Sequence, residues 1–152
     1  MDKEFFLREL EKQSGMLYRV AFTILHDDYA CEDAMQETAL KAWEKRNSLR
    51  EERYFRTWIT RILINTCYNT QKKRLRFVSI ESVPEPLIDP PDLSLSLALQ
   101  SLPEKLRLPF ILCYSEKMSY AEIGNILHIP VATVRGRIYR AKQELKKELD
   151  AE

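Results

Sequence analysis

A helix start and a helix stop lie close together near the carboxyl end of the chain. Ser119 is followed three residues later by Glu122, the pattern of a capping box, in which each side chain satisfies a free backbone N–H at a helix N-terminus. Pro130 follows shortly after, and proline cannot continue the hydrogen-bond ladder of a helix. The sequence therefore predicts a short helix that begins at Ser119 and ends near Pro130.

A second helix is predicted directly after this stop. Its apolar residues recur at i, i+4, i+7 and i+11 as Val134, Ile138, Ala141 and Leu145, a stripe that must pack against another element. Two helices joined by a tight turn form the outline of a helix-turn-helix.

The other faces of this second helix are polar and basic. Its candidate DNA-binding residues are Thr133, Arg135, Gly136, Arg137, Tyr139 and Arg140. Arginines near the leading end of an exposed helix can reach guanine edges and phosphates in a major groove. An ordinary solvated face would have similar residues, but the capping box and the turn favour DNA binding.

The amino-acid composition limits which folds and functions are possible for this chain. A 152-residue chain can form one domain or two small ones, and 45% hydrophobic residues support a packed core. Only three glycines, with abundant Leu, Glu, Lys and Arg, favour helices throughout. The net charge of +1 would argue against a nucleic-acid binder if charge were spread evenly, but a basic cluster stands at Lys72, Lys73, Arg74 and Arg76.

The cysteines exclude a zinc site and a disulfide framework. Cys31, Cys67 and Cys113 are widely separated, and the chain has only two histidines. They predict three reduced, buried thiols and no metal or cofactor. The first residues are too charged for a signal peptide, and no apolar run approaches the length of a membrane span. We therefore expect a soluble, cytoplasmic protein.

Helical spacing predicts three helices in the first half, over residues 5–25, about 30–45, and from 55 onward, with a polar loop over 46–53. On the second helix Asp33, Gln36 and Glu37 share one face. Two carboxylates beside an amide could perform acid–base catalysis, but no histidine, nucleophile or metal-ligand spacing accompanies them. From the pattern alone they are surface residues.

The third helix has a polar stripe that becomes basic toward its end. The candidate nucleic-acid residues on it are Arg61, Asn65, Asn69, Lys72 and Lys73. Asparagines bond base edges, basic residues bond phosphates, and aromatic rings stack on unpaired bases. The alternative is a basic helix C-terminus that complements the helix dipole.

A proline-rich segment divides the chain. Pro84, Pro86, Pro90 and Pro91 resist both helix and sheet, so we expect a linker over residues 78–92 between domains 1–77 and 93–152. A short helix over 93–102 and another from Pro103 to about residue 115, with Pro109 inside it at a kink, would support the helix-turn-helix. The expected architecture is all-α, with two small helical domains.

Three segments together resemble a known family. Residues 119–141, SYAEIGNILHIPVATVRGRIYRA, resemble the last conserved region of bacterial sigma-70 factors of the extracytoplasmic function (ECF) subfamily. In that family this helix-turn-helix recognises the minus-thirty-five promoter element, which implies DNA contacts for the candidate residues listed above on the second helix. Gly136 stands where serine is usual, which removes a hydroxyl contact, and His128 replaces the usual turn glycine, at a left-handed position that costs histidine some energy.

The first half resembles the same family. Residues 33–38, DAMQET, resemble the Asp-x-x-Gln-Glu segment that docks on the coiled coil of the RNA polymerase beta-prime subunit, which implies a polymerase-binding role for Asp33, Gln36 and Glu37. Residues 55–69, FRTWITRILINTCYN, resemble the segment that opens and recognises the minus-ten element, although many relatives have aspartate in place of Asn69.

The resemblance implies an ECF sigma factor, a non-enzymatic subunit that carries core RNA polymerase to promoters and assists strand opening. It also implies control by an anti-sigma factor, often membrane-anchored. One alternative is a dimeric helix-turn-helix repressor or activator on palindromic operators, although the chain has no dedicated dimerisation helix. The other alternative is an enzyme, but the sequence contains no set of residues with the pattern of a catalytic site.

Overall fold

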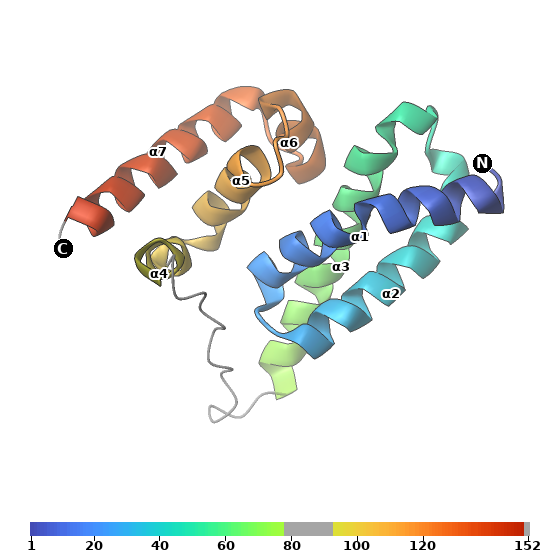
Figure 1. Ribbon diagram of the computed structural model, residues 1–152, viewed down its shortest axis with the longest axis horizontal. Helices are drawn as coiled ribbons and strands as arrows, with labels where there is room; N and C mark the ends of the chain where they lie inside the picture. The colour runs from blue at the N-terminus through green and yellow to red at the C-terminus, as the bar shows by residue number, and fades with distance from the viewer. Residues whose placement is uncertain (78–92, 151–152) are drawn as a thin grey trace. The chain divides into compact units, whose positions relative to one another are not determined.

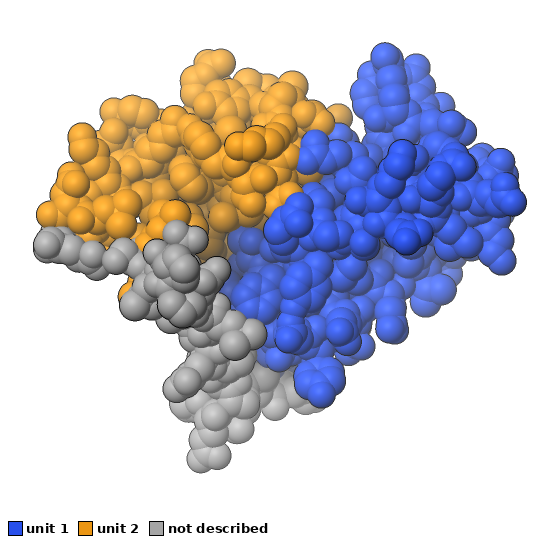
Figure 2. Space-filling view, in the orientation of Figure 1, with its two compact units in different colours: residues 1–84 blue, residues 85–152 orange. Residues whose placement is uncertain are grey.

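The computed structural model describes residues 1–77 and 93–150 (Figure 1). Within these ranges the regular structure consists of α-helices and two short 3-10 helices, without a strand, so the predicted all-α class is confirmed. The chain falls into two compact units, Met1–Pro84 (unit 1) and Glu85–Glu152 (unit 2) (Figure 2). The predicted linker over 78–92, with its four prolines, lies outside the described residues.

Unit 1 is a bundle of three long helices, each in contact with the other two. Its elements are α1 (Lys3–Leu25), α2 (Asp28–Glu44), η1 (Arg46–Ser48), η2 (Glu52–Tyr54) and α3 (Phe55–Phe77). Asp2 and Asp27 cap the first two helices by accepting hydrogen bonds from the backbone N–H groups of Phe5 and Ala30, at 2.8 and 2.9 Å. His26 ends α1 in a left-handed conformation, with φ 53°.

The core of unit 1 is formed by one stripe from each long helix. The predicted stripe of α1 is confirmed, because Leu17, Val20, Ala21 and Ile24 are all buried. Aromatic rings close one end of the bundle, where the ring centroid of Phe6 lies 5.2 Å from that of Trp43 and 6.1 Å from that of Phe55. Such contacts add to the free energy that their area burial supplies.

The polar segment over 46–53 connects α2 to α3 and contains η1 and the start of η2. Trp58 Nε1 on α3 donates to Ser48 Oγ in this segment at 3.0 Å. The prediction of three buried thiols was wrong for Cys113, which is only partly buried, whereas Cys31 and Cys67 are buried. Cys113 is on a helix of unit 2, α5 (Glu104–Tyr114), outside the stripe of buried residues that this helix contributes to the core.

Unit 2 is organised around its last helix, which contacts the other three. Its helices are α4 (Leu93–Ser101), α5 (Glu104–Tyr114), α6 (Tyr120–Leu127) and α7 (Val131–Asp150). The predicted stripe of Val134, Ile138, Ala141 and Leu145 is buried, as the spacing required. Pro103 is the N-cap of α5 rather than its first residue, and α5 continues through the buried Pro109.

Candidate functional site

Reciprocal hydrogen bonds fix the start of α6. The Glu122 backbone N–H donates to Ser119 Oγ at 3.1 Å, and the Ser119 backbone N–H donates to Glu122 Oε1 at 2.9 Å. The predicted capping box is therefore confirmed. Because Ile123 and Ile126 of this short helix are buried, α6 is held both at its first turn and along one face.

The turn between α6 and α7 depends on a glycine that the sequence analysis did not consider. His128 has φ 58°, so the left-handed conformation expected there is confirmed, and its N–H donates to the Gly124 carbonyl oxygen. The Ile129 N–H donates to the same oxygen at 3.0 Å. A Cβ on Gly124 would lie 2.8 Å from the Ile129 carbonyl oxygen. Any other residue at 124 would therefore force the turn to shift.

The candidate residues of α7 lie outside its buried stripe. Arg135, Tyr139 and Arg140 are exposed, whereas Thr133, Gly136 and Arg137 are partly buried. The guanidinium of Arg135 lies 6.0 Å from the ring centroid of Tyr120 on α6. The helix-turn-helix thus presents one helix whose cationic and aromatic side chains face away from the core of unit 2, which is the arrangement that a major groove accepts.

A further cation extends this basic surface along α7. The Nζ of Lys142 lies 4.9 Å from the ring centroid of Tyr114 on α5. A hydrogen bond with the Tyr114 side chain raises the pKa of Lys142, which further favours its charged form.

The polar face of α3 is also opposite a buried stripe. Phe55, Ile59 and Leu63 are buried in the core of unit 1. The candidate residues Asn65, Asn69, Lys72 and Lys73 are exposed, and Arg61 is partly buried. Two amides and two ammonium groups therefore occupy consecutive turns on the outside of the bundle, where base edges and phosphates could be contacted.

Arg74 does not belong to the exposed basic cluster in which the sequence placed it. Its Nη1 donates to the Leu25 carbonyl oxygen at 3.1 Å, and Gln71 Nε2 donates to the Ile24 carbonyl oxygen at 3.3 Å. Both acceptors are at the C-terminal end of α1, where helix carbonyl groups lack intrahelical partners. Arg74 is therefore a structural link between α3 and α1, and the side chain of Arg76 lies outside the described residues.

The three candidate polymerase-binding residues form a polar surface on α2. Asp33 and Gln36 are exposed, and Glu37 is partly buried. Lys41, one turn later, pairs with Glu37 at 3.1 Å between Nζ and Oε1. None of the three belongs to the buried stripe of α2, which is formed by Ala30, Cys31, Ala34, Thr38 and Ala42.

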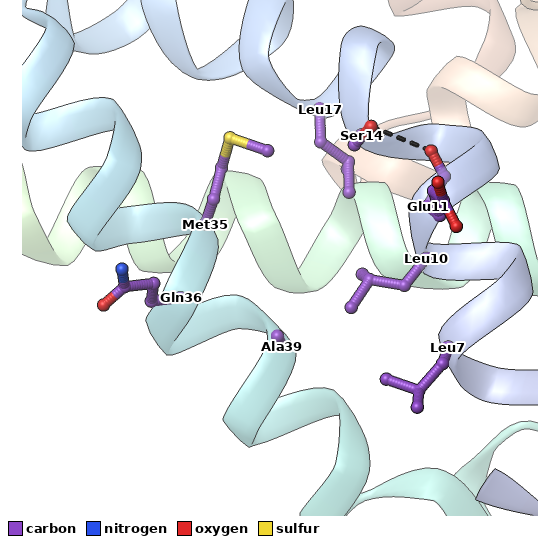
Figure 3. A pocket seen from close by; sticks show the side chains of 8 residues that line it. All are labelled: Leu7, Leu10, Glu11, Ser14, Leu17, Met35, Gln36 and Ala39. Carbon is purple, nitrogen blue, oxygen red and sulfur yellow. Dashed lines mark hydrogen bonds between the residues drawn. The ribbon is translucent and has the colours of Figure 1, made fainter. Parts of the chain in front are cut away.

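An apolar groove with a volume of about 340 Å³ lies between α1 and α2, beside this polar surface. The lining residues are Leu7, Leu10, Glu11, Ser14 and Leu17 of α1 and Met35, Gln36 and Ala39 of α2 (Figure 3). Gln36 therefore belongs both to the polar surface and to the groove. The sequence pattern did not reveal this groove, although Leu7 falls outside the spacing of the buried stripe of α1 and is exposed.

Comparison with known proteins decides the family. The model of sigma-70 region 2 matches residues 10–77, and that of sigma-70 region 4 matches residues 92–145. The ECF RNA polymerase sigma-E factor of Escherichia coli is 32% identical over 134 residues, which cover 74% of this chain and 70% of that protein. The chain belongs to the ECF subfamily of sigma-70 factors.

Further relatives cover almost the whole of this sigma factor. The ECF sigma factor SigW of Bacillus subtilis is 27% identical and matches 97% of this chain and 90% of its own length. A solved structure of the sigma factor RpoE from Bartonella quintana, in complex with the anti-sigma factor NepR, has a TM-score of 0.80 and 27% identity, and covers 95% of this chain and 96% of that one. Both helical units thus have counterparts in the family.

Family membership establishes the class of function. The chain is a non-enzymatic factor for promoter-directed initiation of transcription, and its partners are core RNA polymerase and promoter DNA. The alternatives of an enzyme and of a dimeric repressor are thereby set aside. No helix in the described residues has the length and apolar character needed to span a membrane. Across residues 1–77 and 93–150, no group of histidine, cysteine, aspartate and glutamate side chains is arranged to hold a metal ion.

Proposed function

We propose that this sigma factor docks on the coiled coil of the polymerase beta-prime subunit through Asp33, Gln36 and Glu37 of α2. The exposure of Asp33 and Gln36 supports this assignment, as does the absence of all three from the core of unit 1. Carboxylates exposed on a helix attract a basic partner and make the approach sensitive to salt.

The groove between α1 and α2 extends this docking surface. Its occupant is an apolar side chain of the same coiled coil, because Gln36 lines both the groove and the polar surface. Leu7 at its edge is 51% exposed, which leaves apolar area that a partner helix can cover. A central apolar anchor surrounded by polar residues is the usual composition of a protein interface.

The exposed face of α3 recognises the minus-ten element and assists strand opening. Asn65 and Asn69 bond the edges of bases, while Arg61, Lys72 and Lys73 bind phosphates. The position of these side chains opposite the buried stripe of α3 supports these roles. Residues 1–77 are then the module for polymerase and the minus-ten element.

The helix α7 recognises the minus-thirty-five element from the major groove. Thr133, Arg135, Gly136, Arg137, Tyr139 and Arg140 supply this contact. The confirmed capping box and turn of the helix-turn-helix support it. Residues 93–152 are the second module, and residues 78–92 connect the two so that they can act on separate promoter elements.

We propose that a membrane-anchored anti-sigma factor regulates this protein by covering the polymerase- and DNA-binding faces. The similar Bartonella quintana sigma factor was solved with an anti-sigma factor bound, which supports the presence of a comparable inhibitor here. The sigma factor would act in the cytoplasm, where core polymerase and promoter DNA are found.

The observation that carries this proposal is that α2 and α3 in unit 1 and α7 in unit 2 each have an exposed polar face outside their buried stripe. The decisive experiment forms the holoenzyme from the full chain and core polymerase and selects binding sites from a randomised duplex DNA library. Two preferred sequence elements separated by a spacer are expected, and the free chain should select neither. A single palindromic site selected by the free chain would contradict the proposal.

A further inference from the structure

The three glycines of the chain differ in the space that surrounds them. A Cβ on Gly124 would lie 2.8 Å from a backbone oxygen, so the turn before α7 requires glycine there. A Cβ on Gly15 would meet only the end of the Arg19 side chain, at 3.3 Å. A Cβ on Gly136 would have nothing within 4 Å apart from its own helix and neighbours. The packing of unit 2 therefore does not explain why residue 136 is glycine.

Glycine at this position also has a cost. Gly136 lies in the interior of α7, which runs without interruption from Val131 to Asp150. Glycine in a helix interior loses more backbone entropy on folding than alanine and is correspondingly destabilising. The backbone here is ordinary helix, because no glycine of the described residues has a positive φ. Neither a close neighbour at residue 136 nor an unusual backbone conformation therefore requires glycine there, so nothing within the molecule offsets the loss of stability.

The surroundings of Gly136 indicate a contact outside the molecule. Successive residues of a helix are rotated by about 100°, which places Gly136 on the side of α7 opposite Val134 and Ile138. The exposed Tyr139 and Arg140 follow at i+3 and i+4, so they lie on the same side. Gly136 thus leaves a gap beside a large aromatic and a long cationic side chain. An incoming surface can approach the backbone of α7 more closely at such a gap than where a side chain covers it.

We propose that Gly136 is a specificity-determining residue, because it lets the backbone of α7 approach the base edges of the minus-thirty-five element closely. The inference rests on the proposed role of α7 in the major groove. The missing Cβ brings the helix nearer to the DNA, so that Arg140 and Tyr139 reach further into the groove. A methyl group at 136 would hold the helix away, and hydrogen bonds weaken steeply once their length and angle depart from the preferred range.

The test uses Gly136→Ala in the full chain, assembled with core polymerase. Its probe is the duplex selected by the parent holoenzyme from a library randomised at the minus-thirty-five element. Because the new methyl group meets open space and alanine favours helix, the Tm of the free chain should rise by about 2 to 8 °C. The affinity of the holoenzyme for the probe should fall about fivefold or more, the value of one base contact, and the sequence preference at this element should weaken. A higher Tm together with a lower affinity would show that Gly136 acts through DNA contact, because a purely structural role would not produce this combination.

Gly15→Ala is the matched control, since it makes the same change within α1, which belongs to unit 1. The preference of this variant at the minus-thirty-five element should equal that of the parent. Unchanged or higher affinity of Gly136→Ala would overturn the proposal, as would a fall in Tm, because packing would then require the glycine. If Arg140→Ala weakens the preference while Gly136→Ala does not, this inference fails and the role of α7 stands. If neither has an effect, both fail.

Discussion

The guanidinium of Arg74, near the end of α3, donates a hydrogen bond to the carbonyl oxygen of Leu25, the last residue of α1, at 3.1 Å. The last turn of α1 contains no basic residue of its own. A cation from another helix therefore meets the partial negative charge at the end of α1 and satisfies one of its free carbonyl groups. This link also fixes α3 beside α1 at the level of the exposed Lys72 and Lys73.

Arg74→Ala should lower the free energy of unfolding of unit 1 by about 1 to 2 kcal/mol, because it removes a hydrogen bond from a charged donor. Tryptophan fluorescence during urea unfolding measures this, since both tryptophans, Trp43 and Trp58, lie in unit 1. The neighbouring Lys73→Ala removes an exposed charge and should change the free energy by less than about 0.5 kcal/mol. Equal losses from the two variants would show that the link to Leu25 contributes nothing specific.

Removal of the polar docking residues should abolish binding to core polymerase. The triple variant with alanine at Asp33, Gln36 and Glu37 should retain its helical content in circular dichroism, because none of these residues is buried in the core. A pull-down with core polymerase provides the measurement. Undiminished binding by the folded triple variant would exclude this surface of α2 as the docking site.

The apolar part of the docking surface can be tested separately with Leu7→Lys. A charge at the edge of the groove should weaken polymerase binding about 5- to 30-fold, which corresponds to about 1 to 2 kcal/mol of lost apolar burial. Leu75→Lys is the matched control, because Leu75 is 78% exposed and lies on α3, outside the groove. If both lysines reduced binding equally, general charge rather than the groove would be responsible.

The sequence was most informative where the relevant interactions are local. The capping box joins residues three apart, and the stripe of α7 repeats along one helix, so spacing alone predicted α6, α7 and the buried Val134. The family resemblance added the promoter and polymerase contacts, which spacing could not supply. The left-handed conformation at His128, which the family resemblance implied, is also present.

The features that residue spacing did not predict depend on contacts between residues that are distant in the sequence. Arg74 and its acceptor are 49 residues apart, and nothing in the basic run shows which of its members turns back toward α1. The groove beside Gln36 likewise depends on how α1 and α2 pack, which leaves Leu7 exposed. The requirement for Gly124 arises from the path of the backbone after α6. Each of these features needs three-dimensional structure.

Alkaline pH should destabilise unit 1 through Cys31. Burial raises the pKa of the Cys31 thiol from 9.0 to about 11, and the nearby Asp28 and Asp27 carboxylates add to the effect. Between pH 9 and 11 the unfolded chain ionises this thiol while the folded chain keeps it protonated, so the unfolded state binds fewer protons. The free energy of unfolding should therefore be unaffected by this group below pH 9 and should fall by about 2 to 3 kcal/mol as pH rises to 11.

The measurement is urea unfolding of unit 1 by tryptophan fluorescence at several pH values. Cys31→Ala will lower stability at every pH, but its loss between pH 9 and 11 should be smaller than that of the parent. Cys113→Ala, in unit 2, should retain the pH dependence of the parent for unit 1. A parallel decline for the parent and Cys31→Ala would mean that another group controls the alkaline transition.

Strand opening should depend on the exposed amides of α3. A double variant with alanine at Asn65 and Asn69 should transcribe poorly from a duplex promoter and better from a template with a pre-melted bubble at the minus-ten element. Equal reductions on both templates would exclude a role in melting. Alanine at Lys72 and Lys73 should also reduce the dependence of log affinity on log salt concentration by roughly two, about 0.9 for each lost phosphate contact.

The exposed Arg140 provides the sharpest test of α7. An arginine that is hydrogen-bonded to a base edge contributes about 1 to 3 kcal/mol of discrimination between sequences, whereas loss of an arginine that contacts only phosphate weakens binding to all sequences alike. Arg140→Ala should therefore reduce activity and relax the preference within the minus-thirty-five element, while the preference within the minus-ten element, which depends on α3 in the other unit, stays unchanged. A promoter library transcribed by the parent and variant holoenzymes gives both preferences at once. A uniform loss over all sequences would assign Arg140 to a phosphate, and an unchanged minus-thirty-five preference would mean that this side of α7 does not face the bases.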